Sequence, residues 1–346
     1  MSNAFGLSKV KHLIAISSCK GGVGKSTLAA QLACELASQG FKIGLLDADI
    51  YGPSLPTLFD LHQVTVYSNE FKMITPIEKN GLKLMSFGFL LGNAPAVMRG
   101  PIVTRYVQQL LFQTDWGELD YLLIDMPPGT GDVQLTITQS VRLTGALIIT
   151  THQALSLVDV ARGILMFEKV NVPILGIVEN MSYFICDACS KKHYLFGESH
   201  ANTLSQRFGV PTLAQLPIDR HFSANVTAYQ STEAVQEMAK ALLKSIEDIN
   251  SSDRKPPEVK FDAQHIQIKF SDGKELVLNN RDVRLACQCA LCVDELSGKK
   301  ILNPAKIKID IAPTAITPLG NYAIGIDFND GHNSGIYPYT LLQQLG

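Results

Sequence analysis

The segment Ser17–Thr27, SSCKGGVGKST, most restricts what this chain of 346 residues can fold into. It continues the apolar run HLIAIS and leads into STLAAQLACELASQG, where Leu28, Leu32 and Leu36 fall on one helical face. A glycine-rich turn between a strand and a helix is the setting in which backbone N–H groups surround phosphate oxygens. The sequence therefore predicts a nucleotide site at the start of this helix.

The side chains of this loop indicate how a nucleotide would be held. Lys25 is placed to reach the β and γ phosphates, and Ser26 to offer its hydroxyl to Mg²⁺. A glycine-rich turn without a ligand is the alternative, and the flanking strand and helix argue against it. Where the usual pattern has glycine the chain has Cys19, which we interpret as a tolerated small residue and not a metal ligand. The expected binding segment is Cys19, Lys20, Gly21, Gly22, Val23, Gly24, Lys25, Ser26 and Thr27.

Acidic residues follow two further apolar runs. YLLIDMPPGTGD ends a strand at Asp125, which suits Mg²⁺ binding through water, and Gly129 could sense the γ phosphate. LLDADIYGPSLP places Asp47 and Asp49 just past the carboxyl end of another strand, where ligands bind in such sheets. Asp49 is the candidate to orient or deprotonate the attacking water, although a lone aspartate there is often only a helix cap.

Apolar runs alternate with helical patterns as far as about residue 220. This alternation predicts an α/β fold with a doubly wound, mostly parallel sheet, closed by a helix over Thr232–Ile249. We expect an ATPase domain over residues 1–250, a polar linker over 251–257 and a small α+β domain over 258–346. In that second domain HIQIKF and ELVLN flank a turn and predict a hairpin.

Composition excludes some partners. The chain is 46% hydrophobic, and 30 basic residues face 32 acidic ones, which leaves no electrostatic footprint for nucleic acid. No apolar stretch approaches the ~18 residues of a membrane span, and the first residues lack a signal-peptide pattern. We expect a cytoplasmic protein with no nucleic-acid or membrane partner, whose seven cysteines are thiols or metal ligands.

The run Cys19–Thr27 resembles the deviant Walker A motif of the family that contains the septum-site, plasmid-partition and nitrogenase iron-protein ATPases. The resemblance implies a homodimer around ATP, in which Lys20 reaches the partner's nucleotide and offsets charge on the transferred phosphoryl group. Lys20, Lys25 and Asp49 are then the expected catalytic residues. A solvated surface lysine is the alternative for Lys20.

The stretch Val172–Gly197, with DADIYGPSLP and LLIDMPPGTGD, is similar to the Mrp/ApbC group of iron–sulfur cluster carrier ATPases over about residues 8 to 245. In that group the position of Asn180 recognises the adenine base. The resemblance also implies that Cys186 and Cys189 hold a labile [4Fe–4S] cluster across a two-fold dimer, because two thiolates are half of the usual ligand set.

Two other interpretations of this cysteine pair stay open. Cys186, Cys189, His193 and His200 could form a zinc site within one chain, although their spacing matches no common zinc finger closely. The pair could also be a redox couple without metal.

A second cysteine cluster lies in RLACQCALCVDELSGKK. Cys287, Cys289 and Cys292 are three ligands that need a fourth, for which His332 is the natural candidate. The region resembles the small N-terminal domain of γ-butyrobetaine hydroxylase, in which such a set binds zinc. An ordinary surface loop is the alternative for His332, and a redox or cluster-accepting role for the cysteines stays open.

Together these features predict a slow ATPase that assembles a [4Fe–4S] cluster at its dimer interface and delivers it to apo iron–sulfur proteins. The expected cofactors are ATP, Mg²⁺ and the cluster, with Zn²⁺ in the second domain, and an upstream assembly scaffold is the expected donor. A positioning or partition ATPase is one alternative, but it should carry a basic patch or a terminal amphipathic helix. An ATP-coupled electron-transfer protein is the other.

Overall fold

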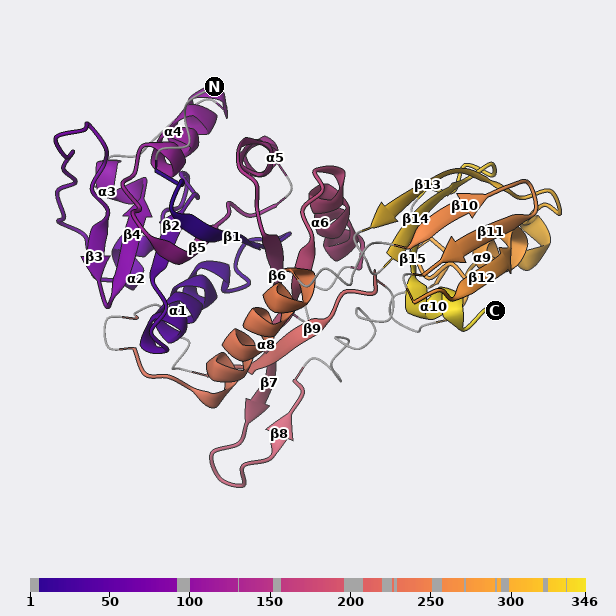
Figure 1. Ribbon diagram of the computed structural model, residues 1–346. Helices are drawn as coiled ribbons and strands as arrows, with labels where there is room; N and C mark the ends of the chain where they lie inside the picture. Colours follow the sequence, from indigo (N-terminus) through magenta and orange to yellow (C-terminus); the bar gives the residue numbers. More distant parts are fainter. Residues whose placement is uncertain are drawn as a thin grey trace.

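The computed structural model describes most of the chain. The described residues are 6–91, 100–129, 131–151, 157–195, 208–219, 226, 229–250, 257–270, 272–289, 291–293, 299–319, 323–333 and 335–346. Within them a nine-stranded sheet with flanking helices is followed along the chain by two three-stranded sheets (Figure 1). No helix in these ranges is both long enough and apolar enough to cross a lipid bilayer.

The large sheet is parallel except at β3 and β8, in the order β3-β4-β2-β5-β1-β6-β7-β8, with β9 also paired to β7. Its central strands are buried on both faces, which explains why they are continuous apolar runs in the sequence. The strands are β1 (Val10–Ser17), β2 (Ile43–Asp47), β3 (Ile77–Lys79), β4 (Leu82–Ser86), β5 (Leu119–Asp125), β6 (Gly145–Thr151), β7 (Ile174–Ile185), β8 (Lys192–His193) and β9 (Thr212–Pro217).

Helices cover both faces of this sheet, as the doubly wound pattern predicts. α1 contacts α8 on one side, and α4 contacts α5 on the other, with α6 further along that side (Figure 1). The helices are α1 (Lys25–Ser38), α2 (Leu55–Leu58), α3 (Gly88–Leu91), α4 (Gly100–Phe112), α5 (Asp132–Ser140), α6 (Leu157–Lys169) and α8 (Glu233–Asn250).

A carboxylate on α1 fixes the segment that leads into α8. Glu35 accepts hydrogen bonds from the Tyr229 hydroxyl at 2.8 Å and from the Ser231 hydroxyl, and also from the Gln39 side chain. These hydrogen bonds hold the pKa of Glu35 below its ordinary value even though burial acts in the opposite direction. The α1–α8 pair therefore depends on a charged group that is buried in the fold.

Residues from 257 onward form two antiparallel sheets, β10-β11-β12 and β13-β14-β15. They have a buried cluster of their own, which includes Ile266, Leu278, Phe328 and Tyr337. The predicted hairpin is confirmed, since β11 and β12 pair through the turn at Gly273, whose φ of 86° suits glycine. The elements are β10 (Glu258–Phe261), β11 (His265–Lys269), β12 (Glu275–Asn279), α9 (Asn280–Leu285), η2 (Pro304–Lys306), β13 (Pro313–Leu319), β14 (Ala323–Phe328), β15 (Gly335–Pro338) and α10 (Tyr339–Gln343).

Candidate functional site

The carboxyl edge of the large sheet gathers the predicted nucleotide-binding residues. The register places Asp47 of β2 directly beside Asp125 of β5, and Thr151 of β6 beside Asn180 of β7. The glycine-rich loop leaves β1 at this same edge, between β5 and β6. Parallel strands thus bring together residues that are far apart in the sequence.

The loop has the backbone that a phosphate cradle requires. Gly22 and Gly24 have φ values of 78° and 82°, in the left-handed region that favours glycine. A Cβ at Gly24 would also collide with the side-chain amide of Asn180. That amide donates to the Val23 carbonyl at 2.9 Å, so the loop is fixed from β7 as well as from its own helix.

Lys25 and Asp125 form a buried ion pair at the start of α1. Lys25 Nζ also lies 3.3 Å from the Ser26 hydroxyl. Burial raises the pKa of Asp125, while the Lys25 charge acts against that rise. The second carboxylate oxygen, Asp125 Oδ2, is buried and has no hydrogen-bond partner among the described residues. A buried oxygen of this kind beside a serine hydroxyl fits a hydrated Mg²⁺, which would supply the missing donors.

Asp47 organises the loop that follows β2. Its carboxylate accepts hydrogen bonds from the backbone N–H groups of Asp49, Ser54 and Leu55 at 3.1, 2.8 and 3.2 Å, and from the Ser86 hydroxyl at 3.0 Å. Burial, followed by the charge of Asp125, raises the pKa of Asp47 to about 7. Asp47 lies at the predicted place, but its contacts are those of a support for the loop. Nothing in the sequence indicated Ser86 as its partner.

Asp49 stands at the beginning of that loop and is half-buried. Its Oδ1 accepts from the backbone N–H groups of Tyr51 and Gly52 at 3.2 and 3.3 Å. The negative charge of Asp49 contributes to the raised pKa of Asp125, which places the two carboxylates in one electrostatic environment. This position suits a group that orients water beside bound phosphates.

Lys20 and Gly129 are both hydrogen-bonded to Ser18 at the loop's first turn. Lys20 is exposed, and its carbonyl accepts a hydrogen bond from the Ser18 hydroxyl at 2.9 Å. The Gly129 N–H donates to the Ser18 carbonyl at 2.9 Å, with a φ of 95°. The segment after β5 is therefore tied directly to the loop, as a sensor of the γ phosphate would need to be.

Asn180 presents an unused acceptor in a buried position. Only 3% of its surface is exposed, and its Oδ1 has no hydrogen-bond partner within the described ranges. Its side-chain nitrogen, Nδ2, already donates to the Val23 carbonyl. An exocyclic amino group of adenine would supply the donor that Oδ1 needs.

Cys19 packs against α6. A Cβ built on Gly163 would lie 2.6 Å from Cys19 Sγ, so the two positions are in close contact. The thiol thus has a packing neighbour about 140 residues away along the chain, which the sequence did not indicate. This contact agrees with the interpretation of Cys19 as a residue chosen for its size.

The pair Cys186 and Cys189 lies in what we name the cysteine hairpin, residues 184–193, where β8 folds back on the end of β7. The N–H groups of Ala188 and Cys189 donate to the Cys186 sulfur and lower the pKa of its thiol. The sulfurs of both cysteines and a ring nitrogen of His193 lie within 4.8 Å of one another. His200, the fourth member of the zinc alternative, lies outside the described residues.

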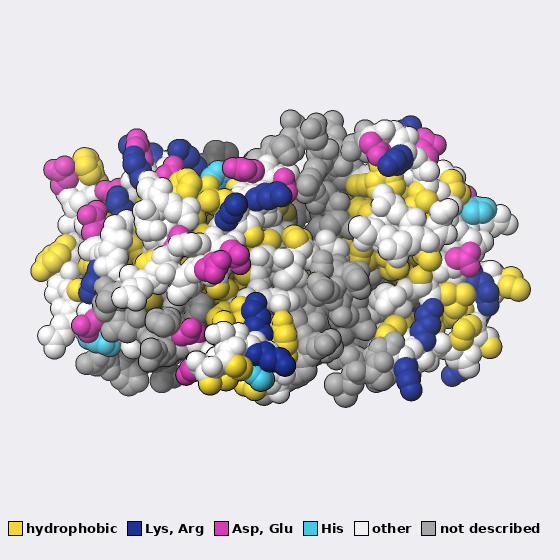
Figure 2. Space-filling view, turned by 90° about the horizontal axis from the view of Figure 1, so that it is seen from below, with side chains coloured by type: hydrophobic (Ala, Val, Ile, Leu, Met, Phe, Trp, Pro, Cys, Tyr) yellow, Lys and Arg dark blue, Asp and Glu magenta, His cyan; other side chains and the backbone are white. Residues whose placement is uncertain are grey.

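The cysteine hairpin is largely exposed, and Cys189 and His193 are both open to solvent. Figure 2, which looks from the side toward which the hairpin projects, shows basic, acidic and apolar side chains interspersed over the coloured surface. Thiolates in this position can be reached by another protein.

The second cluster is assembled from the loop that follows α9 and the turn between β14 and β15. Nε2 of His332 lies 3.2, 3.6 and 4.0 Å from the sulfurs of Cys287, Cys289 and Cys292. Cys287, Cys292 and His332 are buried. The structure therefore brings together the four side chains that the sequence singled out, and three sulfurs with one imidazole are a donor set that fits tetrahedral zinc.

Charge around this cluster also fits a cation. Hydrogen bonds to Cys289 and Cys292 raise the pKa of His332 to about 9, and the neighbouring sulfurs raise that of Cys287 far above its ordinary value. Arg284, which sequence reasoning did not identify, donates to Cys292 Sγ at 3.4 Å and to Asp330 at 2.9 Å. Three thiolates in so small a space require positive charge, which a divalent ion and Arg284 would provide.

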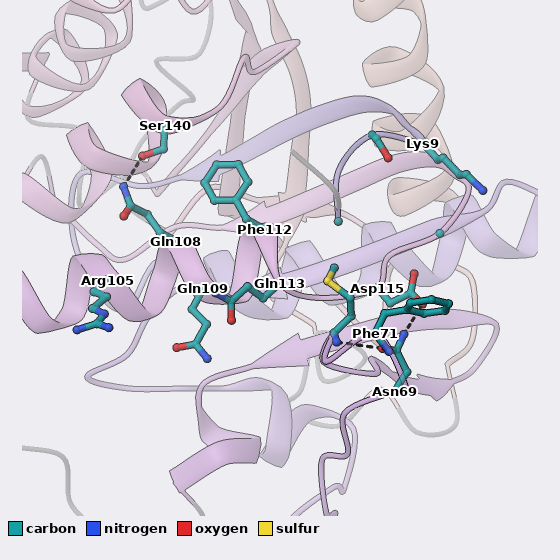
Figure 3. A pocket seen from close by; sticks show the side chains of 14 residues that line it. Lys9, Asn69, Phe71, Arg105, Gln108, Gln109, Phe112, Gln113, Asp115 and Ser140 are labelled. Atoms are coloured by element: carbon teal, nitrogen blue, oxygen red, sulfur yellow. Dashed lines mark hydrogen bonds between the residues drawn. The ribbon is translucent and has the colours of Figure 1, made fainter. Parts of the chain in front are cut away.

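A pocket lies at the opposite, amino-terminal edge of the sheet. It has a volume of about 1270 Å³ and is lined by side chains of α4 and of the loop before β3 (Figure 3). Some of the polar side chains that line the pocket are hydrogen-bonded to one another, Gln108 to Ser140 and Asn69 to Asp115. It contains none of the predicted site residues, so we do not place the chemistry there.

Two family models match successive parts of the chain. A family model described as the NUBPL iron-transfer P-loop NTPase matches residues 9–251, and one described as γ-butyrobetaine hydroxylase-like, N-terminal, matches residues 258–343. Among solved structures, a nucleotide-binding protein of Archaeoglobus fulgidus in complex with ADP, with cobalt found in it, aligns with a TM-score of 0.57 at 38% identity. That alignment covers 68% of this chain and 90% of that one.

Curated relatives include the chloroplastic Fe-S cluster assembly factor HCF101 of Arabidopsis thaliana, 42% identical over 99% of this chain and 66% of that protein. The iron-sulfur cluster carrier protein of Aquifex aeolicus is 50% identical over 61% of this chain and 58% of its own length. The chain thus spans less than two thirds of the length of both relatives. On the match over residues 9–251, the chain belongs to the NUBPL-type family of iron-transfer P-loop NTPases.

Proposed function

We propose that this chain is an ATP-hydrolysing carrier that assembles a [4Fe–4S] cluster between two of its copies and transfers it to apo iron–sulfur proteins. The observation that carries the proposal is the exposed cysteine hairpin at the end of β7, the strand that also holds Asn180 in the nucleotide site. A nucleotide site and a thiolate site are thereby joined by one element. The names of the relatives, an assembly factor and a carrier protein, support the same activity.

The nucleotide half of the proposal assigns a role to each contact at the sheet edge. Phosphates take the backbone N–H groups of the loop and draw Lys25 away from Asp125. Asp125 and Ser26 are then available to hold Mg²⁺, which neutralises charge on the phosphates. Asn180 Oδ1 accepts from the adenine amino group, which satisfies a buried acceptor.

Hydrolysis depends on two residues that the free chain leaves partly open to solvent. Asp49 orients the water that attacks the γ phosphorus and takes its proton. The exposed Lys20 reaches the nucleotide of a second copy, where its charge offsets the charge on the transferred group. Because Lys20 acts across the interface, hydrolysis is slow in a single chain and requires a homodimer.

The cargo is held by the cysteine hairpin. Each chain offers two thiolates, so two chains related by a two-fold axis supply the four that a [4Fe–4S] cluster takes. Exposure of Cys189 lets the thiols of an acceptor or of an upstream assembly scaffold reach the cluster and exchange ligands. A buried site would not permit this exchange.

The second cluster serves stability. Cys287, Cys292 and His332 are buried, in contrast to Cys189 and His193, and their ligand set is complete within one chain. We assign it to a zinc ion that holds the loop after α9 against the β14–β15 turn.

Anaerobic reconstitution with iron and sulfide tests the proposal. The wild-type dimer should bind about four irons, as a shared cluster requires, and pass them to an apo [4Fe–4S] protein. Cys186→Ser should lose the iron and keep ATP binding. Cys34→Ala is the matched control, because Cys34 is buried in α1 with a pKa raised to about 12, and it should load normally. Normal loading of Cys186→Ser would refute the assignment.

A further inference from the structure

We infer that His193 is a third metal ligand beside Cys186 and Cys189, so that a single chain binds one divalent ion of the zinc or ferrous type without a partner. The inference rests on the proposed function's assignment of the two cysteines as metal ligands and adds a second state of the same site. In that state the metal is held by one chain, whereas the shared cluster needs two.

Backbone pairing brings His193 to the cysteines. In the antiparallel pairing of β7 with β8, His193 is opposite Phe184 and Lys192 is opposite Ile185. The Cys186 N–H donates to the Lys191 carbonyl at 3.0 Å, and the Ser190 N–H to the Cys186 carbonyl at 2.8 Å, which closes the turn. The turn therefore sets the position of His193 relative to both sulfurs.

Side-chain contacts hold β8 on β7. Tyr194, next to His193, packs on the buried Tyr183 with ring centroids 6.0 Å apart. Lys192 Nζ lies 4.4 Å from the centroid of that same Tyr183 ring. Residues on both sides of His193 are thus anchored on one aromatic ring, which lowers the entropy lost when the imidazole binds a metal.

The distances suit one tetrahedral ion. The three ligand atoms lie within 4.8 Å of one another. Two sulfurs bound to one zinc at about 2.3 Å are roughly 3.8 Å apart, so small side-chain rotations would complete the site. Two N–H groups already point to the Cys186 sulfur, as outer-shell donors do around thiolate ligands.

Charge favours the same class of ion. Two thiolates and a neutral imidazole around a divalent cation sum to zero, so the exposed site needs no counter-ion comparable to Arg284 at the second cluster. Sulfur and nitrogen ligands select zinc or ferrous iron over magnesium or calcium. The fourth position stays open to water or to an incoming ligand.

Cobalt(II) titration of the full metal-free chain tests the inference, because cobalt bound by thiolates in a tetrahedral site absorbs visible light. The titration is made at protein concentrations at which sedimentation shows a monomer. It compares wild type, His193→Gln and the control His265→Gln. The side chain of His265 is 42% exposed and belongs to neither cysteine cluster. The second cluster contributes equally to all three, so a difference between them reports the hairpin.

Wild type and His265→Gln should bind two cobalt ions per chain, and His193→Gln should bind the hairpin ion at least about tenfold more weakly. Titrations of wild type and His193→Gln that coincide would overturn the inference. Anaerobic iron loading of Cys186→Ser distinguishes an error in the third ligand from an error in the proposed function. If that variant loses the cluster while the two cobalt titrations coincide, only the third ligand is wrong.

Discussion

Asn180 and Cys186 are joined by a single strand: β7 carries Asn180, whose side chain donates to the Val23 carbonyl of the glycine-rich loop, and ends one residue before Cys186. Six residues of strand span at most about 20 Å. Between them Met181 has a φ of 54°, and the pairing of β7 with β9 shifts register between Glu179 and Tyr183. Under the proposed function, a nucleotide that contacts Asn180 would act on a strand with a local irregularity just before the cysteine hairpin.

Replacing Asn180 should affect base selection more than cluster loading. Asn180→Ala removes both the acceptor for adenine and the support of the Val23 carbonyl, so ATP affinity should fall about tenfold or more. Discrimination between ATP and GTP should shrink with it. Calorimetric titration with both nucleotides checks this, and unchanged discrimination would show that another group recognises the base.

Substitution of Lys25 should impair nucleotide binding, whereas substitution of Lys20 should impair hydrolysis. Lys25→Ala removes the cation that contacts the phosphates, so nucleotide binding should be lost. Lys20→Ala should keep ATP binding and lose about 10³-fold in hydrolysis, the effect expected for a charge supplied across an interface. Lys11→Ala, which removes an exposed lysine paired with Asp120, is the control. Steady-state ATPase rates with binding constants separate the two steps, and equal hydrolysis in Lys20→Ala would contradict the role of Lys20.

Substitutions at Cys19 and Gly163 should have non-additive effects on ATP affinity, because the two residues are in contact. Gly163→Ala places a Cβ 2.6 Å from Cys19 Sγ, so the loop or α6 must shift and ATP should bind more weakly. Adding Cys19→Gly removes the sulfur and should restore binding, while Cys19→Gly alone keeps it. A double-mutant cycle on ATP affinity measures the coupling. Additive effects would mean that the two residues do not interact.

Glu35 should contribute stability that depends on pH. Its pKa in the folded chain lies below the ordinary 4.5, so this stability is present above pH 4.5 and is lost as the pH falls through the lowered pKa. Glu35→Gln should lower the free energy of unfolding by about 2 kcal/mol at pH 7, the scale of hydrogen bonds to a charge. The difference from wild type should shrink below pH 4.5 in urea unfolding. Glu118→Gln, in an exposed pair with Lys42, should change little. A constant difference at all pH values would exclude the charge as the cause.

Arg284 should strengthen zinc binding at the second cluster. Arg284→Met leaves Cys292 without its donor and should weaken zinc binding about 10- to 100-fold, the usual effect of losing an outer-shell group. Arg281→Met alters a neighbouring arginine whose side chain donates to the Pro304 carbonyl and not to a cysteine, and it is the matched control. Competition with a zinc-binding dye gives both affinities. Equal affinities would remove Arg284 from the site.

Local patterns account for what the sequence predicted. Residues of the loop and the aspartates after β2 and β5 were predicted because strand ends and spacing identify them, and parallel pairing then placed Asp47 beside Asp125. The hairpin at Gly273 followed from alternation around a turn. Asn180 was found only through family resemblance, since an asparagine in a strand has no distinctive local pattern.

Contacts between distant segments could not be predicted. Ser86 reaches Asp47, and Cys19 meets Gly163, only because the sheet order and helix packing bring these segments together. Arg284 and Asp330 are also far apart in the sequence and form a hydrogen bond beside Cys292. For His193 a signal existed, a histidine four residues after a Cys-x-x-Cys pair, and the sequence named it together with His200 as one alternative.

Native mass spectrometry of the anaerobically reconstituted chain shows whether two chains share one cluster. A shared cluster gives one Fe₄S₄ unit on two chains, which is lost when Cys186 is replaced by serine. A complete Fe₄S₄ unit on a single chain, or four irons bound by the dimer without sulfide, would contradict a shared cluster.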